Sequence, residues 1–280
     1  MTGPADAWRA RLSINQATAE TSGTEELLDA CVAAGVPAVA PWRHKYVGGD
    51  VRRTRRALDG RGLRASSLCR GGFFTGTRSP AEARRDNRAA VEEAAELGAP
   101  VLVLVCGPVH DGRPVAAVDL IRAGIEDLLP FAADHDVVLA VEPFHPMFLA
   151  ERSAIVTLDQ AVDLVERIDH PHLGIAVDTY HVWWDPRLPQ ALERAAARTV
   201  SVHVADWLVP TPSVLTGRGL PGDGVADLAG IVGGLLRDGY EGSIEVEVLN
   251  EDVWATPVGA LVGDIRTRMA GLLDGLEVVA

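Results

Sequence analysis

The strongest constraint on the fold is an alternation of short apolar runs and longer amphipathic stretches, which continues from one end of the chain to the other. Each apolar run predicts a strand, and each amphipathic stretch with apolar residues at helical spacing predicts a helix. Repeated strand–helix units build parallel sheets covered by helices. Eight such units without a break in composition predict an α/β protein, a single (β/α)₈ TIM barrel spanning residues 1–280.

The predicted strands and helices alternate in strict order. Strands are expected at Leu12–Asn15, Ala38–Trp42, Ala65–Arg70, Val101–Cys106, Val137–Glu142, Leu173–Asp178, Val200–Val204 and Ile244–Val248. Helices are expected at Thr24–Ala34, Val51–Arg61, Pro80–Leu97, Ala116–Asp134, Leu158–Ile168, Pro189–Ala197, Ala226–Asp238 and Val258–Leu273. Residues 1–10 precede the first strand as an N-terminal extension. Residues 208–224 are too long for an ordinary connection and are therefore a candidate active-site loop.

The bulk composition fits one large intracellular domain. The chain has 280 residues, and barrels of this class have about 250, so a full core can form without disulfides. Three cysteines without a C-x-x-C spacing argue against a disulfide framework. The N-terminal segment lacks the apolar region of a secretion signal. We therefore expect a cytoplasmic protein.

Charge and lysine content argue against several classes of partner and mechanism. The formal net charge of −13 disfavours a nucleic-acid partner, because nucleic-acid binding relies on clustered Lys and Arg. No apolar run is long enough to span a membrane. Lys45, the single lysine, falls in a loop just past the second strand among other basic residues. This placement argues against a Schiff-base aldolase, which needs a lysine at a strand end.

Polar side chains occupy matching positions in the last four predicted strands. Bulky apolar residues alternate along these strands, for example Val200, Val202 and Val204, and these should face the helices because strand side chains alternate between faces. The opposite parity faces the barrel interior. In each strand it places a carboxylate or an imidazole at or near the C-terminal end, where catalytic groups of this fold lie. These residues are Glu142, Asp178, His203 and Glu247.

Four such side chains at one barrel mouth predict a divalent metal site. An unpaired buried carboxylate pays a large desolvation cost, and several carboxylates repel each other, whereas a divalent cation removes both penalties. Three carboxylates and one imidazole suit Mn²⁺, Mg²⁺ or Co²⁺ better than a structural zinc site, although Zn²⁺ is compatible. We expect one divalent cation, Mn²⁺ first, bound by Glu142, Asp178, His203 and Glu247. Glu245 shares the inward parity of Glu247 but lies deeper, and the sequence indicates no function for it.

Five segments carry motifs of a known family. They are VEPFHP (141–146), VDTYH (177–181), SVHVAD (201–206), RGLPGDG (218–224) and GYEGSIEVE (239–247). Together they resemble the xylose-isomerase-like TIM-barrel superfamily, in particular its sugar phosphate isomerase/epimerase branch with ketose 3-epimerases, inosose dehydratases and hydroxypyruvate isomerases. The resemblance is strongest from residue 133 to residue 247. By this resemblance, the family's metal ligands correspond to Glu142, Asp178, His203 and Glu247.

The resemblance implies a metal-dependent isomerase or epimerase of a ketose or keto-sugar. Such enzymes remove a proton next to a carbonyl group and return it elsewhere, while the metal stabilises the enediolate oxygen. Glu142 and Glu247 are the implied catalytic acid–base pair. His181 would hydrogen-bond the reacting oxygen, and Arg218 would bind a hydroxyl or an anionic group of a small carbohydrate.

Three aromatic residues are further candidates for substrate binding. His145 follows the fifth strand and is expected at the barrel mouth. Trp183 and Trp184 lie just past a strand end beside the catalytic candidate His181, where indole faces could stack on a sugar ring. Phosphate often binds in the loops after strands seven and eight, and Arg218 is their only basic residue near the mouth, which favours an unphosphorylated substrate.

The same platform allows other functions. Proton abstraction followed by loss of a β-substituent would make the chain a lyase or dehydratase of a keto-inositol or a 3-keto glycoside. Apurinic endonucleases share the superfamily, and resemblance to them would imply a three-zinc site with additional histidines. At the corresponding stretch this chain has Gly217, Arg218 and Gly219 instead. A non-catalytic sugar-binding barrel stays open, as does assembly into homo- or hetero-oligomers.

Overall fold

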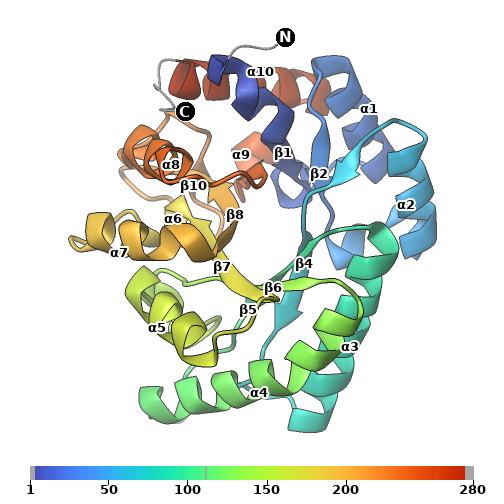
Figure 1. Cartoon of the computed structure of the whole chain (residues 1–280). Helices are drawn as coiled ribbons and strands as arrows, with labels where there is room; N and C mark the ends of the chain where they lie inside the picture. Colours follow the sequence, from blue (N-terminus) through green and yellow to red (C-terminus); the bar gives the residue numbers. More distant parts are fainter. Residues whose placement is uncertain (1–3, 111, 275–280) are drawn as a thin grey trace.

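The computed structural model describes residues 4–110 and 112–274 (Figure 1). Of the N-terminal extension predicted at residues 1–10, residues 1–3 lie outside the described part. Pro4–Arg11 form a 3₁₀ helix, η1, that leads into the first strand. The rest of the chain follows the predicted alternation of strands and helices.

In the described residues, one parallel sheet holds nine strands in the order β3-β2-β1-β11-β8-β7-β6-β5-β4. Strands of this sheet that follow one another in the chain pair with each other, except for β3 and β4, which form the two ends of the order. The strands are β1 (Leu12–Asn15), β2 (Ala38–Ala40), β3 (Arg64–Ala65), β4 (Leu68–Gly72), β5 (Val101–Val105), β6 (Val138–Val141), β7 (Leu173–Asp178), β8 (Thr199–Val204) and β11 (Ile244–Val246).

The third predicted strand closes the barrel in two pieces. Its first piece, β3, pairs with β2, and its second piece, β4, pairs with β5. Ser66, which lies between the two pieces, and Cys69, in the second piece, donate their N–H groups to the carbonyl groups of Val39 and Pro41. The two ends of the sheet order therefore belong to one stretch of chain, so the structure is the single TIM barrel predicted from the sequence.

Helices surround the barrel on the outside (Figure 1). Their bounds are α1 (Thr24–Ala34), α2 (Val51–Asp59), α3 (Pro80–Leu97), α4 (Pro114–Asp134), α5 (Leu158–Ile168), α7 (Leu188–Ala195), α8 (Leu228–Arg237) and α10 (Val258–Leu273). Besides short 3₁₀ segments, four further elements lie beyond strand ends and are absent from the prediction: the short helices α6 (Thr179–Val182) and α9 (Glu251–Trp254), and the antiparallel pair β9 (Asp206–Trp207) and β10 (Arg218–Gly219). All four lie near the barrel mouth, where they position functional side chains.

The core has two parts, as strand alternation requires. Outward residues such as Leu139 and Val177 join the large cluster between sheet and helices, whereas inward residues such as Val103 and Ala140 form a small cluster inside the barrel. Val200 contradicts its predicted outward direction, because it packs against the inner cluster. A register shift in the β7–β8 ladder explains this, since it lies next to Val200 and interrupts the alternation there.

Among the helices of residues 4–110 and 112–274, none combines the length and hydrophobicity that crossing a membrane requires.

Candidate metal centre and cavity

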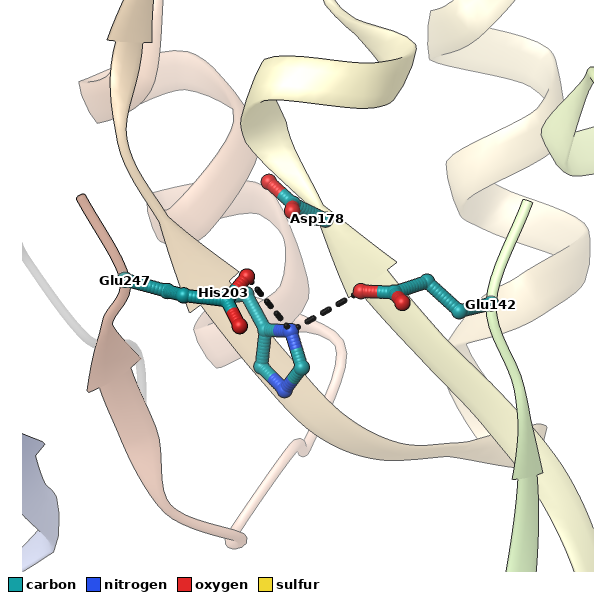
Figure 2. Close-up of side chains that lie close together, drawn as sticks. All are labelled: Glu142, Asp178, His203 and Glu247. Carbon is teal, nitrogen blue, oxygen red and sulfur yellow. Dashed lines mark hydrogen bonds and ion pairs between the residues drawn. The ribbon is translucent and has the colours of Figure 1, made fainter. Parts of the chain in front are cut away.

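The four predicted ligand residues meet at the C-terminal ends of four neighbouring strands. Asp178 ends β7, His203 lies near the end of β8, and Glu142 and Glu247 directly follow β6 and β11. All four are buried, and each offers one ligand atom such that these atoms lie within 4.8 Å of one another. Figure 2 shows His203 between Glu142 and Glu247, with Asp178 facing the same space. The barrel therefore gathers the ligand set that strand parity predicts.

The two ring nitrogens of His203 face different groups, one at the barrel mouth and one in the barrel interior. Nδ1 faces the cluster, 3.0 Å from Oε1 of Glu142 and 3.7 Å from Oε2 of Glu247. Nε2 faces the barrel interior, 3.2 Å from Oγ of Ser201 and 3.4 Å from Oε2 of Glu245. A carboxylate behind a ligating imidazole fixes its tautomer and orientation. Nδ1 is therefore the atom available to a metal.

Glu245 and Glu247 occupy different places, and Glu247 is the one that faces the barrel mouth. Glu247 lines the cavity at the barrel mouth. Glu245 is fully buried beneath His203, where its Oε2 accepts hydrogen bonds from Ser67 and Asn15 at 3.1 and 3.5 Å. Burial raises the pKa of Glu245. Its other oxygen, Oε1, has no hydrogen-bond partner among the described residues.

Arg218 inserts its guanidinium into the cluster. Nη1 donates to Oδ2 of Asp178 at 2.9 Å and to Oε2 of Glu247 at 2.8 Å, while Nη2 lies 3.3 Å from Nε2 of His181. The guanidinium also stacks over the ring of Tyr180 at 4.8 Å. Burial alone would lower the pKa of Arg218, but Asp178 and Glu247 outweigh it and raise the pKa. The predicted binding residue thus contacts the metal-ligand candidates directly.

The candidate loop at residues 208–224 delivers this arginine. The strand β9, just before the loop, pairs with β10 inside it, so that Arg218 lies opposite Trp207. Buried Asp206 accepts hydrogen bonds from the backbone N–H groups of Trp207, Gly222, Gly224 and Ala226, and so ties the base of the loop together. Asn250 donates to the carbonyl group of Arg218 at 2.8 Å. The loop is therefore ordered by many backbone contacts rather than by packing alone.

The charges of the cluster fit a divalent cation. Among the described residues, the four buried carboxylates, including Glu245, lie beside one guanidinium, that of Arg218, and two imidazoles, those of His203 and His181. Buried negative charge without compensation is costly, and this cost raises the pKa of a buried carboxyl group. Burial raises the pKa of Glu142, and it raises the pKa of Asp178 to about 7. A divalent cation would replace the proton on His203 and add positive charge beside the carboxylates, and the oxygen-rich donor set suits a hard or borderline ion.

The pKa of His203 responds in the opposite direction. Burial alone would lower it, but the hydrogen bond to Glu142 and the charges of Glu247 and Glu245 raise it to about 10. Without a metal, the imidazole therefore serves as a cation. His181 differs, because burial and the nearby Arg218 hold its pKa well below the usual value, so its imidazole is neutral.

A cavity of about 310 Å³ opens directly over the cluster. Its floor contains Glu142, Glu247 and Arg218, and its walls contain aromatic residues and two further arginines: Trp42, Phe144, Trp254, Arg70 and Arg152. Leu215 from the 208–224 loop completes one side. The volume is in the range of small-molecule sites.

Several predicted binding residues lie outside the lining of this cavity. His181 is 1% exposed, stacks on Phe144 with ring centroids 4.2 Å apart and faces Arg218 instead of the cavity. His145 stacks on Trp207. Trp184 donates to the carbonyl group of His181, and Trp183 borders a separate hollow of about 500 Å³ beside α7 and α8. Their positions indicate support of Arg218 and its loop, so the sequence-based roles in substrate contact stay predictions.

The cavity also contains residues that sequence reasoning missed. Arg70 ends the third predicted strand, and its place at a strand end was the available signal. Arg152 and Trp254 come from a loop and a short helix outside the predicted pattern. Lys45 is held by the carbonyl groups of Ala19, Glu20 and Ser22 and is absent from the cavity lining.

Comparisons with known proteins agree with this architecture. The model of the family described as xylose isomerase-like TIM barrel matches residues 28–272. A 3-dehydroshikimate dehydratase of Pseudomonas aeruginosa is 31% identical over 263 residues, covering 87% of this chain but only 39% of that protein. The chain thus spans well under half the length of this relative.

Two further similarities differ in what they cover. A Streptomyces coelicolor protein, provisionally named a hydroxypyruvate isomerase, is 30% identical over 179 residues, which cover 60% of this chain and 61% of that protein. The crystal structure of a protein from Sinorhizobium meliloti 1021 superimposes with a TM-score of 0.90 at 41% identity, covering 95% of this chain and 99% of that one. Because the family model matches most of its length, the chain belongs to the xylose isomerase-like TIM-barrel family.

Proposed function

We propose that this chain is a divalent-metal-dependent isomerase or epimerase that moves a proton next to the carbonyl group of a small hydroxylated substrate. The observation that carries the proposal is the position of Glu142 and Glu247. Both reach the cavity floor from different strands and lie on either side of His203 (Figure 2). A substrate above the cluster would therefore meet two carboxylates, as a proton removed and returned at different positions requires.

The metal site supports this chemistry. A divalent cation held by Glu142, Asp178, His203 and Glu247 would polarise a substrate carbonyl and lower the cost of negative charge on its oxygen. We place Mn²⁺ first among the candidate ions, with Mg²⁺, Co²⁺ and Zn²⁺ as alternatives, on the basis of the donor set.

The chain's own residues supply proton transfer and positioning. One of the two carboxylates, Glu142 or Glu247, takes the proton from carbon, and the other returns a proton to the substrate. Arg218 orients the carboxylate of Glu247 through its 2.8 Å hydrogen bond. His181 accepts from Arg218 at 3.3 Å in its neutral form and so positions the guanidinium. The aromatic walls exclude water from one face of the substrate.

A second candidate function is that of a dehydratase. It is favoured by the 31% sequence identity to the 3-dehydroshikimate dehydratase of Pseudomonas aeruginosa, in an alignment that covers 87% of this chain. Here one carboxylate takes the proton next to the carbonyl, and the electron pair of that C–H bond forms a carbon–carbon double bond. The C–O bond of the β-hydroxyl group breaks, and the hydroxyl leaves as water with a proton from the second carboxyl group. The first half of this reaction is the proton abstraction of the isomerase.

Exchange of substrate hydrogen for deuterium tests both functions. Metal-stripped protein reloaded with Mn²⁺ would be incubated in D₂O with ketoses, inososes, 3-keto glycosides and 3-dehydroshikimate, and followed by NMR and mass spectrometry. An isomer carrying deuterium supports the first function, and a product lighter by one water supports the second. Metal-loaded protein that exchanges no proton with any of them would favour the non-catalytic barrel.

A further inference from the structure

The cavity above the metal cluster carries two arginines that its chemistry does not use. Arg70 belongs to β4, and Arg152 lies in the loop between β6 and α5. Both are half-buried and both line the cavity that contains Glu142 and Glu247. Neither forms an ion pair with a carboxylate in the described part of the chain. Most other arginines in the described ranges that are not fully exposed do form such pairs, for example Arg43 with Asp86 and Glu93.

Both arginines are held in place without an acidic partner. The guanidinium of Arg70 lies over the ring of Phe73 at 4.2 Å, which is a cation–π contact. The backbone of Arg152 is fixed at both ends, because its N–H group donates to Phe148 at 2.8 Å and its carbonyl group accepts from Gly107 at 2.8 Å. The cation–π contact therefore holds the charge of Arg70 beside the cavity, and the fixed backbone of Arg152 places that residue in the cavity lining.

The electrostatics of the pair is unfavourable without a ligand. Burial lowers the pKa of Arg70, and the positive charge of Arg152 lowers it further. Half-buried like charges without counter-ions are costly. The carboxylates that share the cavity lining, Glu20, Glu142 and Glu247, form ion pairs with other described residues and none with Arg70 or Arg152. An anionic ligand would provide the missing partner, and the planar fork of each guanidinium matches a carboxylate or a phosphate.

We infer that Arg70 and Arg152 form an anion-binding subsite, so that the substrate is a keto compound bearing a carboxylate or phosphate group. Its anionic group would lie at the arginines while its carbonyl end faces Glu142 and Glu247. This inference rests on the proposed function for the reacting end of the substrate and names the class of the other end. The sequence favoured an unphosphorylated substrate, because the loops after strands seven and eight offer only Arg218. Arg70 and Arg152 change that expectation, because they come from earlier parts of the barrel.

Matched pairs of ligands test the subsite by binding alone. Calorimetry on the Mn²⁺-loaded protein would compare D-glucuronate with D-glucose and D-fructose 6-phosphate with D-fructose. Each pair differs by one anionic group, so the first reports on carboxylate and the second on phosphate. We expect the charged member of at least one pair to bind about 10- to 100-fold more tightly. Equal binding within both pairs would overturn the subsite.

Variants assign the preference to the two arginines. Arg70→Met and Arg152→Met should each remove most of the preference for the charged ligand, and Arg70→Lys should keep part of this preference because the charge remains. Arg266→Met, an exposed arginine on α10, should leave it intact. A preference that survives the double substitution would refute the assignment. Measuring binding and proton exchange side by side on the wild-type protein separates the two proposals, since charge preference without exchange into any substrate would support the subsite and contradict only the reaction.

Discussion

Nη1 of Arg218 donates a 2.8 Å hydrogen bond to Oε2 of Glu247 at a barrel mouth where both side chains are buried. The same nitrogen donates to Oδ2 of Asp178 at 2.9 Å. One guanidinium thus bridges two of the four candidate metal ligands. Because arginine stays charged in proteins, it is a permanent counter-charge, and a metal adds the compensation that Arg218 alone cannot supply.

Replacing Arg218 should destabilise the metal-free protein strongly. Arg218→Met leaves two buried carboxylates without their cation, which costs ~3–5 kcal/mol in the free energy of unfolding. Urea unfolding of the metal-stripped protein measures this loss, and saturating Mn²⁺ should recover part of it. Arg268→Met is the matched control, because Arg268 also bridges two carboxylates, Asp223 and Asp264, but near the surface, and exposed pairs contribute ~1 kcal/mol or less. Equal losses in the two variants would contradict the account.

Metal content should depend on His203. We expect about one tightly bound Mn²⁺ per wild-type chain after stripping and reloading, and little in His203→Ala, as measured by elemental analysis. His172→Ala is the control, because His172 pairs with Asp136 at the opposite end of β7. A wild-type chain that retains no ion would refute the four-ligand assignment.

Glu245 and Glu247 should fail in different ways when replaced by glutamine. Glu245→Gln loosens the orientation of His203, so metal affinity should fall about 10- to 100-fold while excess Mn²⁺ restores turnover. Glu247→Gln removes an acid–base group, so turnover should fall by about 10²–10⁴-fold even at saturating metal. Titration calorimetry and proton exchange in D₂O separate the two quantities. Exposed Glu241 provides the control variant, Glu241→Gln, and a Glu245→Gln defect that excess metal does not repair would refute a positioning role.

Metal affinity should rise with pH. Without metal, His203 holds its proton up to its pKa of about 10 and Asp178 up to about 7, and a metal ion must displace each proton that is present. Affinity should therefore increase about tenfold per pH unit between pH 7 and 10, and more steeply below pH 7. Calorimetry in buffers of different ionisation enthalpy counts the protons released. Affinity that is flat between pH 6 and 9 would contradict these protonation states.

Much of the barrel could be predicted because its signals are local. Strand–helix alternation and the inward parity of Asp178 and His203 depend on residues adjacent in sequence. The same logic failed for Val200, because a register shift between two strands interrupts the parity and leaves no mark in the sequence. It also left Glu245 unexplained, since its contacts with Asn15 and Ser67 join segments far apart along the chain.

The sequence by itself determined the fold class, the barrel end that carries chemistry and the four candidate metal ligands, because each follows from a repeating local pattern. Only the tertiary structure decided that Arg218 bridges Asp178 and Glu247, that His181 faces Arg218, and that the cavity walls contain Arg70 and Arg152. The physical reason is barrel closure. It brings loops from distant strands to one mouth, where the side chains that meet depend on loop paths and register, which no local periodicity encodes.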